Sequence, residues 1–122
     1  MKRFGFSKSA RLLKPAEFDR VMRRRTSASD GLVIVYAARG ESQATRLGLV
    51  VSRRCGNAVA RNRWKRLMRE AFRLCGHELP KGLDLVVLPR PGAEPQFGRL
   101  RRSLKTLAAR LEHRLPAAEP KR

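Results

Sequence analysis

The sequence predicts an α+β fold in which helices pack on a small mixed β-sheet. Three short apolar runs rich in β-branched residues predict strands, and three stretches with apolar residues at helical spacing predict helices. Their order is helix, strand, strand, helix, strand, helix, which is typical of a sandwich of helices on a sheet. A chain of 122 residues that is 42% hydrophobic can form one modest core. We therefore expect one domain over residues 1–116, with a basic segment at 1–10 and a disordered tail at 117–122.

The first half of the chain predicts one helix and two strands. Residues 15–22 begin with a proline, which suits the first turn of a helix, and Phe18 and Met22 fall on one face of that helix. Residues 32–37 form a β-branched run between glycines, and residues 46–52 form a second such run. Because only a short connection separates these two strands, we expect them to pair antiparallel.

The second half predicts a long helix, a third strand and a final helix. Asn57 is placed to cap a helix that runs to about residue 74, with Gly76 as its C-terminal stop. Residues 83–88 are a third apolar strand, which ends at a proline-rich loop. Residues 97–115 have helical apolar spacing and precede a proline, so they form the last helix.

The composition indicates a polyanionic partner. The chain carries 29 Lys and Arg against 10 Asp and Glu, a formal net charge of +19. Charge of one sign at this density opposes compaction and favours binding to polyanions, so anions are expected to stabilise the fold. Arginine outnumbers lysine, and its planar guanidinium can both grip phosphate and stack on exposed bases. Nucleic acid, and RNA before DNA, is therefore the expected partner.

The helix predicted from residue 57 has one apolar stripe and one basic face. The stripe recurs at the spacing of a core-facing surface. It consists of Ala60, Trp64, Leu67, Met68, Ala71 and Phe72. The remaining positions from 61 to 73 hold six cations, one amide that can both donate and accept, and one acid, Glu70. The candidate RNA-binding residues are Arg61, Asn62, Arg63, Lys65, Arg66, Arg69 and Arg73. So dense a run with almost no compensating acid favours contact with RNA over a merely solvated face.

Three more candidate RNA contacts precede this helix. Ser52, Arg53 and Arg54 lie at the predicted turn from strand to helix. Backbone N–H groups and a helix N-terminus attract phosphate at such a turn. We therefore include these three residues in the candidate RNA-binding set.

The sequence offers no cluster for protein-borne catalysis or metal binding. Cys55 and Cys75 are isolated thiols without a CxxC pair, and His77 and His113 have no metal-ligand spacing, so we expect no metal site. No run approaches the length of a membrane helix, and the N-terminus lacks the apolar stretch of a secretory signal. We expect a soluble, cytoplasmic protein that does not bind membranes.

Residues 8–115 resemble the protein subunit of bacterial ribonuclease P. The resemblance is densest in three segments, each of which matches the family at fixed offsets. They are Leu-Gly-Leu-Val-Val-Ser-Arg-Arg at 47–54, Gly-Asn-Ala-Val at 56–59 and Arg-Asn-Arg-Trp-Lys-Arg-Leu-Met-Arg-Glu-Ala-Phe at 61–72. Leu12, Lys14, Phe18 and Val21 also resemble the opening helix of the family.

The resemblance implies a fold and a function. The fold would be a sandwich like a domain of certain ribosomal proteins, with a left-handed βαβ crossover through the basic helix, against the usual right-handed rule. The function would be to join a large catalytic RNA in an endoribonuclease that removes the 5′ leader from precursor tRNA. The RNA would carry out the hydrolysis with bound Mg²⁺. No catalytic residue is then expected on the protein.

The resemblance also implies a cleft that holds the single-stranded leader between the first helix and the sheet. The family usually has aromatic residues there, on which bases stack. Phe18 matches, whereas Met22 stands at the next helix position. On the first strand an ungapped match reaches Val35, and Tyr36 is one residue away, a shift that reverses the face of the sheet. All four residues are candidate cleft residues.

Two other function classes remain open from the residues alone. A ribosomal or RNA-chaperone protein would share the size and charge, but it would not selectively improve cleavage of precursor tRNA. A DNA-binding protein could place the basic helix in a major groove. That reading is disfavoured because strands flank the helix where a helix-turn-helix partner would be needed.

Overall fold

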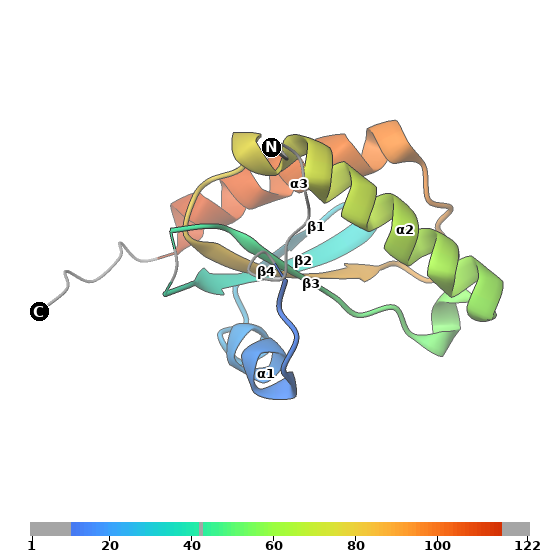
Figure 1. The fold of residues 1–122 in the computed structure, drawn as a ribbon, viewed down its shortest axis with the longest axis horizontal. Helices are drawn as coiled ribbons and strands as arrows, with labels where there is room; N and C mark the ends of the chain where they lie inside the picture. Colours follow the sequence, from blue (N-terminus) through green and yellow to red (C-terminus); the bar gives the residue numbers. More distant parts are fainter. Residues whose placement is uncertain (1–10, 42, 116–122) are drawn as a thin grey trace, which may run out of the picture.

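The computed structural model describes residues 11–41 and 43–115, which form three helices and a four-stranded sheet (Figure 1). The helices are α1 (Pro15–Arg23), α2 (Ala58–Cys75) and α3 (Phe97–Arg114). The strands are β1 (Ser27–Ser29), β2 (Val33–Arg39), β3 (Arg46–Leu49) and β4 (Leu83–Pro89). The α+β class and the order of the six predicted elements are confirmed. The expected N-terminal segment and C-terminal tail lie outside the described residues.

Local signals in the sequence explain where the helices begin. Pro15 opens α1, and the Glu17 carboxylate accepts hydrogen bonds from the backbone N–H groups of residues 13 and 14. The Asn57 side chain accepts from the N–H of Ala60 at 2.9 Å, which confirms it as the cap of α2. The Gln96 side chain caps α3 in the same way, with a 2.7 Å bond from the N–H of residue 99.

The end of α2 differs in detail from the prediction. The helix runs to Cys75, and Gly76 follows it with φ of −57°, which is not the left-handed conformation of a glycine stop. The chain instead tightens into a 3-10 turn over Gly76–Glu78.

The strand order is β1-β2-β4-β3, so the antiparallel pairing predicted for the runs 32–37 and 46–52, which correspond to β2 and β3, is wrong. β4 lies between them, antiparallel to β2 and parallel to β3. All of β4 except Leu88 is buried, and a strand covered on both faces belongs in the centre of a sheet. The parallel pair β3 and β4 is joined through α2, which is the expected βαβ crossover. The left hand implied for this crossover stays a prediction.

The sequence analysis also missed β1. This strand is only Ser-Ala-Ser, and it pairs with β2 at the edge of the sheet. Three residues with a single apolar side chain carry no recognisable strand pattern. The segment is a strand because it pairs with β2.

The two faces of the sheet are covered unequally, with α2 and α3 on one face and α1 on the other (Figure 1). The larger cluster joins α2 and α3 to the sheet and includes Trp64, Met68, Leu85 and Leu104, each at most 2% exposed. The smaller cluster lies under α1. It consists of Leu12, Val21, Ala38 and Val86, with Phe18, Met22, Tyr36, Val50 and Leu88 partly buried around them. No helix of the described residues is long and apolar enough to cross a membrane.

Candidate nucleic-acid interface

The large core sets the orientation of α2. Trp64, Met68 and Phe72 are buried against the sheet and α3, and Leu67 packs against the same cluster, so the predicted core stripe is confirmed. The opposite side of the helix must then face solvent. Its exposed members are Asn62, Arg63, Arg66 and Arg69, and Arg61, Lys65 and Arg73 are half-buried beside them. We call these seven residues the basic face of α2.

Arg73 differs from the other cations of this face. Its guanidinium forms an ion pair with Glu70, with a 3.0 Å bond from Nε to Oε1 and a second bond from Nη2 to Oε2. The hydrogen bond from Arg73 holds the pKa of Glu70 below its usual value, against a smaller opposing effect of desolvation. The carboxylate offsets the charge of Arg73. The positive potential of α2 is therefore concentrated between Arg61 and Arg69.

The turn that directly precedes α2 adds two cations near the N-terminus of this helix. Arg53 and Arg54 lie in a 3-10 turn over Arg53–Cys55, and together with Ser52 they are exposed. Gly56 follows with φ of +123°, and a Cβ there would lie 2.8 Å from that of Ala60, so only glycine lets the turn pack this closely on the helix. The three predicted turn residues are thus held beside the N-terminus of α2, where N–H groups and the helix dipole attract phosphate.

A second candidate surface lies on the other face of the sheet, beside α1. Phe18 and Met22 from α1 and Tyr36 from β2 pack around the smaller cluster, and each remains partly exposed. We call these three residues, with Val50 and Leu88, the α1-side surface. It is apolar and aromatic, so it suits the planar faces of unpaired bases.

Val35 does not belong to this surface, so its assignment to the cleft is corrected. It is 1% exposed and packs in the larger cluster beneath α2 and α3. Successive side chains of a strand point to opposite faces, so the alternation that buries Val35 on one side brings Tyr36 to the other. The structure therefore selects Tyr36 of the two strand candidates.

An ion-pair network fixes α1 to the sheet beside this surface. Asp84 of β4 is fully buried and takes a bidentate pair from Arg46 of β3, at 2.9 Å from Nε and 2.8 Å from Nη2. Arg20 of α1 also pairs with Asp84 and donates a 3.1 Å bond to the carbonyl of Arg39. Arg46 reaches Glu17 of α1 as well, at 2.9 Å. One carboxylate on the sheet thus holds two arginines, and the network binds α1 at two points.

The network accounts for shifted pKa values within it. Hydrogen bonds from the N–H groups of Lys14 and Leu13 lower the pKa of Glu17 most, and Arg46 lowers it further. The hydrogen bonds that Arg46 donates to Asp84 raise the pKa of Arg46. Because Glu17 has a lowered pKa, its contribution to stability is present above its unfolded value, near 4.5, and is lost as the pH falls below that.

The sequence analysis did not identify the members of this network. Arg20, Arg46 and Asp84 are far apart in the sequence and have no motif spacing. One signal was present, namely a lone carboxylate inside the apolar run 83–88. A buried charge requires a partner, but only the sheet register shows that Arg46 lies opposite Asp84.

The described His, Cys, Asp and Glu side chains do not gather into a group that could hold a metal ion. Among residues 11–41 and 43–115, no three His, Cys, Asp or Glu side chains lie close enough to hold a metal ion. Burial raises the pKa of the Cys75 thiol, which keeps it protonated, and Cys55 and Cys75 are both free. The buried acid Asp84 is occupied by arginines. These residues do not fit a resident divalent cation.

Comparisons with known proteins show the family to which this chain belongs. The family model for ribonuclease P matches residues 6–112. A ribonuclease P protein component of Brevibacillus brevis is 47% identical over 88 residues, covering 71% of this chain and 70% of that one. One from Gluconacetobacter diazotrophicus is 41% identical over 107 residues, covering 82% and 92%. The solved ribonuclease P protein of Thermotoga maritima superposes with a TM-score of 0.74 at 32% identity, covering 82% and 96%. The chain belongs to the ribonuclease P protein component family, the protein part of an endonuclease complex that processes tRNA.

Proposed function

We propose that this protein binds the catalytic RNA of ribonuclease P through the basic face of α2 and the turn before it. The observation that carries the proposal is the arrangement of α2, in which a buried stripe holds the basic face outward on a rigid helix. Arginine forks can grip phosphate oxygens bidentately, and Asn62 can both donate to and accept from RNA. In the cytoplasm, the protein would offset repulsion within the folded RNA and between that RNA and precursor tRNA.

The single-stranded 5′ leader of precursor tRNA is proposed to lie on the α1-side surface. Phe18 and Tyr36 come from different elements and are both partly exposed around the same cluster. Each can stack on one base, for about 1–3 kcal/mol per base. Met22 adds a polarisable but non-aromatic contact, so two aromatic side chains carry the stacking.

Hydrolysis of the leader bond is assigned to the RNA subunit, with Mg²⁺ bound mainly by the RNA. The role of this chain is then to bind and orient RNA. The support is the chemistry of the side chains, because the described acids are paired with arginines or dispersed and do not form a divalent-metal site. DNA and membranes are not expected partners.

The first test is cleavage of a precursor tRNA by a bacterial ribonuclease P RNA at low Mg²⁺ and fixed salt, with and without the protein. Wild type should stimulate cleavage. Arg61→Ala/Arg66→Ala should lower the affinity for the RNA by about ten- to a hundredfold, because two charge-assisted contacts are lost. The matched control is Lys81→Ala/Lys105→Ala, which removes two cations outside the basic face and should behave like wild type. A folded wild type without stimulation would favour a ribosomal or chaperone role.

The leader surface has a separate test. Phe18→Ala should weaken binding of precursor tRNA to the assembled complex by about tenfold and leave binding of mature tRNA unchanged, because only the precursor carries a leader to stack. The control is Phe97→Ala, which removes another half-buried ring that packs against the larger cluster. Equal losses for the two tRNAs would refute the assignment.

A further inference from the structure

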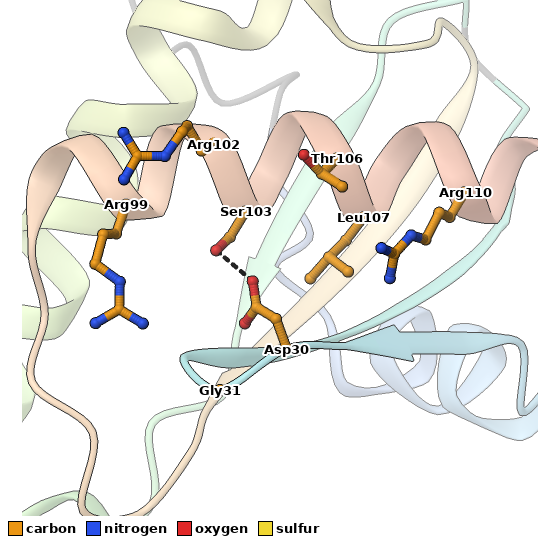
Figure 2. Close-up of a pocket in the computed structure, with 8 residues that line it drawn as sticks. All are labelled: Asp30, Gly31, Arg99, Arg102, Ser103, Thr106, Leu107 and Arg110. Atoms are coloured by element: carbon orange, nitrogen blue, oxygen red, sulfur yellow. Dashed lines mark hydrogen bonds between the residues drawn. The ribbon is translucent and has the colours of Figure 1, made fainter.

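A pocket of about 290 Å³ lies between α3 and the turn that joins β1 to β2 (Figure 2). Its polar lining comes from that one turn and from α3. The residues are Asp30, Arg99, Arg102, Ser103, Thr106 and Arg110. In Figure 2, Arg99 and Arg110 extend from α3 on either side of Asp30, and Arg102 leaves the opposite side of the helix. The three arginines are exposed. We call this the α3 pocket.

The single carboxylate of the pocket is already used within the fold. Asp30 Oδ1 accepts bonds from the N–H groups of Leu32 and Val33 at 2.8 and 3.0 Å, and Oδ2 accepts from the Ser103 hydroxyl at 2.6 Å. Partial burial opposes ionisation of Asp30, but these bonds and the charge of Arg99 together lower its pKa. Asp30 therefore ties the turn to α3 and offsets at most one of the surrounding charges.

Two further arginines, which do not line the pocket, bond to residues 27–30. Arg90 donates from Nε to the carbonyl of Asp30 at 2.6 Å and from Nη2 to the Ser29 hydroxyl at 3.1 Å. Arg114 donates to the carbonyl of Ser27. All three bonds are to neutral groups, so they compensate neither guanidinium charge.

The positive charge of the α3 pocket exceeds the negative charge that the described residues place in its lining. Within residues 11–41 and 43–115, none of Arg99, Arg102 and Arg110 forms an ion pair. Glu112 is the only acid of α3. Arg99 and Arg110 flank one carboxylate, and an anion bound beside them would relieve the repulsion among the arginines of the pocket.

The size of the charged row favours a chain of phosphates over a single small anion. Arg99 and Arg110 are eleven residues apart on one helix, a span of about 16 Å at 1.5 Å per residue. One phosphate group cannot reach both ends of such a row. The Thr106 hydroxyl lies between them and is exposed, so it can donate to a phosphate oxygen.

The α3 pocket is separate from the basic face of α2. It lies at the β1 edge of the sheet, since α3 contacts β1 and β2, whereas the chain enters α2 from β3 at the other edge. We propose that the α3 pocket is a second RNA-binding site, which takes the phosphodiester backbone of an RNA segment other than the one on α2. The protein would then bridge two RNA segments across the width of its sheet.

The first experiment measures the affinity for a bacterial ribonuclease P RNA as a function of salt. Arg99→Gln/Arg110→Gln should weaken binding about tenfold at fixed salt. It should also reduce the slope of log affinity against log salt by about one to two units, because two phosphate contacts are lost. Lys81→Gln/Lys105→Gln is the matched control, since it removes the same charge, partly from α3 itself, and its loss should be below about threefold. Equal effects of the two pairs would overturn the proposal.

The second experiment separates this site from the basic face of α2. Photo-crosslinkers on Cys introduced by Thr106→Cys and by Asn62→Cys, each in a Cys55→Ser background, should mark different nucleotides of the RNA. No crosslink from position 106, or the same nucleotides from both, would refute a second segment. The losses of RNA-binding free energy should add when the two double variants, Arg99→Gln/Arg110→Gln and Arg61→Ala/Arg66→Ala, are combined, because the two sites are separate. If only the α3 variant lost affinity for the RNA, RNA binding by the basic face of α2 would be rejected and RNA binding at the α3 pocket would be supported.

A third measurement excludes a small ligand. Inorganic pyrophosphate is titrated into the wild type and into Arg99→Gln/Arg110→Gln. If pyrophosphate binding depends on these arginines while RNA affinity does not, the α3 pocket takes small anions and the proposal is wrong. Unchanged pyrophosphate binding together with reduced RNA affinity supports it.

Discussion

The two faces of the sheet are built in different ways. The face under α2 and α3 holds the larger apolar cluster, which includes Trp64 at 2% exposure. The face under α1 holds a cluster of only four buried residues. Ion pairs of Asp84 provide further contacts on this face. One face is closed by long helices of 18 residues, and the other is only partly covered by a helix of 9.

The closed face is a rigid support for the basic face of α2, and the partly covered face is the proposed binding surface for the leader. A closed core holds the basic face of α2 at a constant orientation, which suits many simultaneous contacts with a folded polyanion. The short α1 leaves Phe18 and Tyr36 partly exposed, which suits an unpaired ligand that brings its own apolar faces. Ion pairs fix the position of α1 without filling the surface beside it.

The largest expected contrast is in stability. Trp64→Ala should lower the free energy of unfolding by about 4 kcal/mol, because a fully buried indole leaves a cavity. Phe18→Ala should cost only about 1–2 kcal/mol, because the ring is partly exposed. Urea denaturation in sulfate buffer, which favours the compact state of so basic a chain, measures both. The comparison fails if the two losses are equal.

The ion pairs provide the next contrast. Asp84→Ala should cost about 3 kcal/mol, because it leaves two arginines beside a buried position without their carboxylate. Glu17→Gln removes the outer carboxylate of the same network and should cost at most about 1 kcal/mol. Hydrogen exchange should show faster exchange in α1 than in α2 for Asp84→Ala. Uniform loss of protection would mean that the network supports the whole fold.

The smallest effect tests the contact between α1 and the sheet. A Cβ at Gly48 would lie 2.7 Å from the ring of Phe18, so Gly48→Ala should push the ring outward. The expected loss is about 1–2 kcal/mol. Gly31→Ala is the control, because nothing lies within 4 Å of its added Cβ and its cost should be within about 0.5 kcal/mol. Equal thermal stability of the two variants would show that α1 adjusts freely.

The sequence predicted the elements whose signals are local. The stripe from Trp64 to Phe72 identified α2 and its inward side, because helical periodicity is a property of the helix itself. Asn57 predicted the start of α2 from its own side-chain chemistry. The candidate RNA contacts on α2 were correctly expected to face outward, since the buried stripe leaves them no other side.

The features that were missed depend on distant partners. The strand β1 has almost no apolar pattern, and only pairing with β2 makes it a strand. The antiparallel pairing expected for β2 and β3 was wrong because β4 enters between them from more than thirty residues later in the chain. The network of Arg20, Arg46 and Asp84 exists only in that register.

The sequence by itself determined the class of the fold, the polyanionic partner and the outward side of α2, because charge and periodicity are carried by consecutive residues. Only the tertiary structure decided that Tyr36 and not Val35 joins Phe18. Alternate side chains of a strand point to opposite faces, and the strand's own sequence does not say which face will be covered. The helices that pack on one face decide it. The same packing brings the arginines of α3 beside Asp30 of the turn before β2, where no local pattern links them.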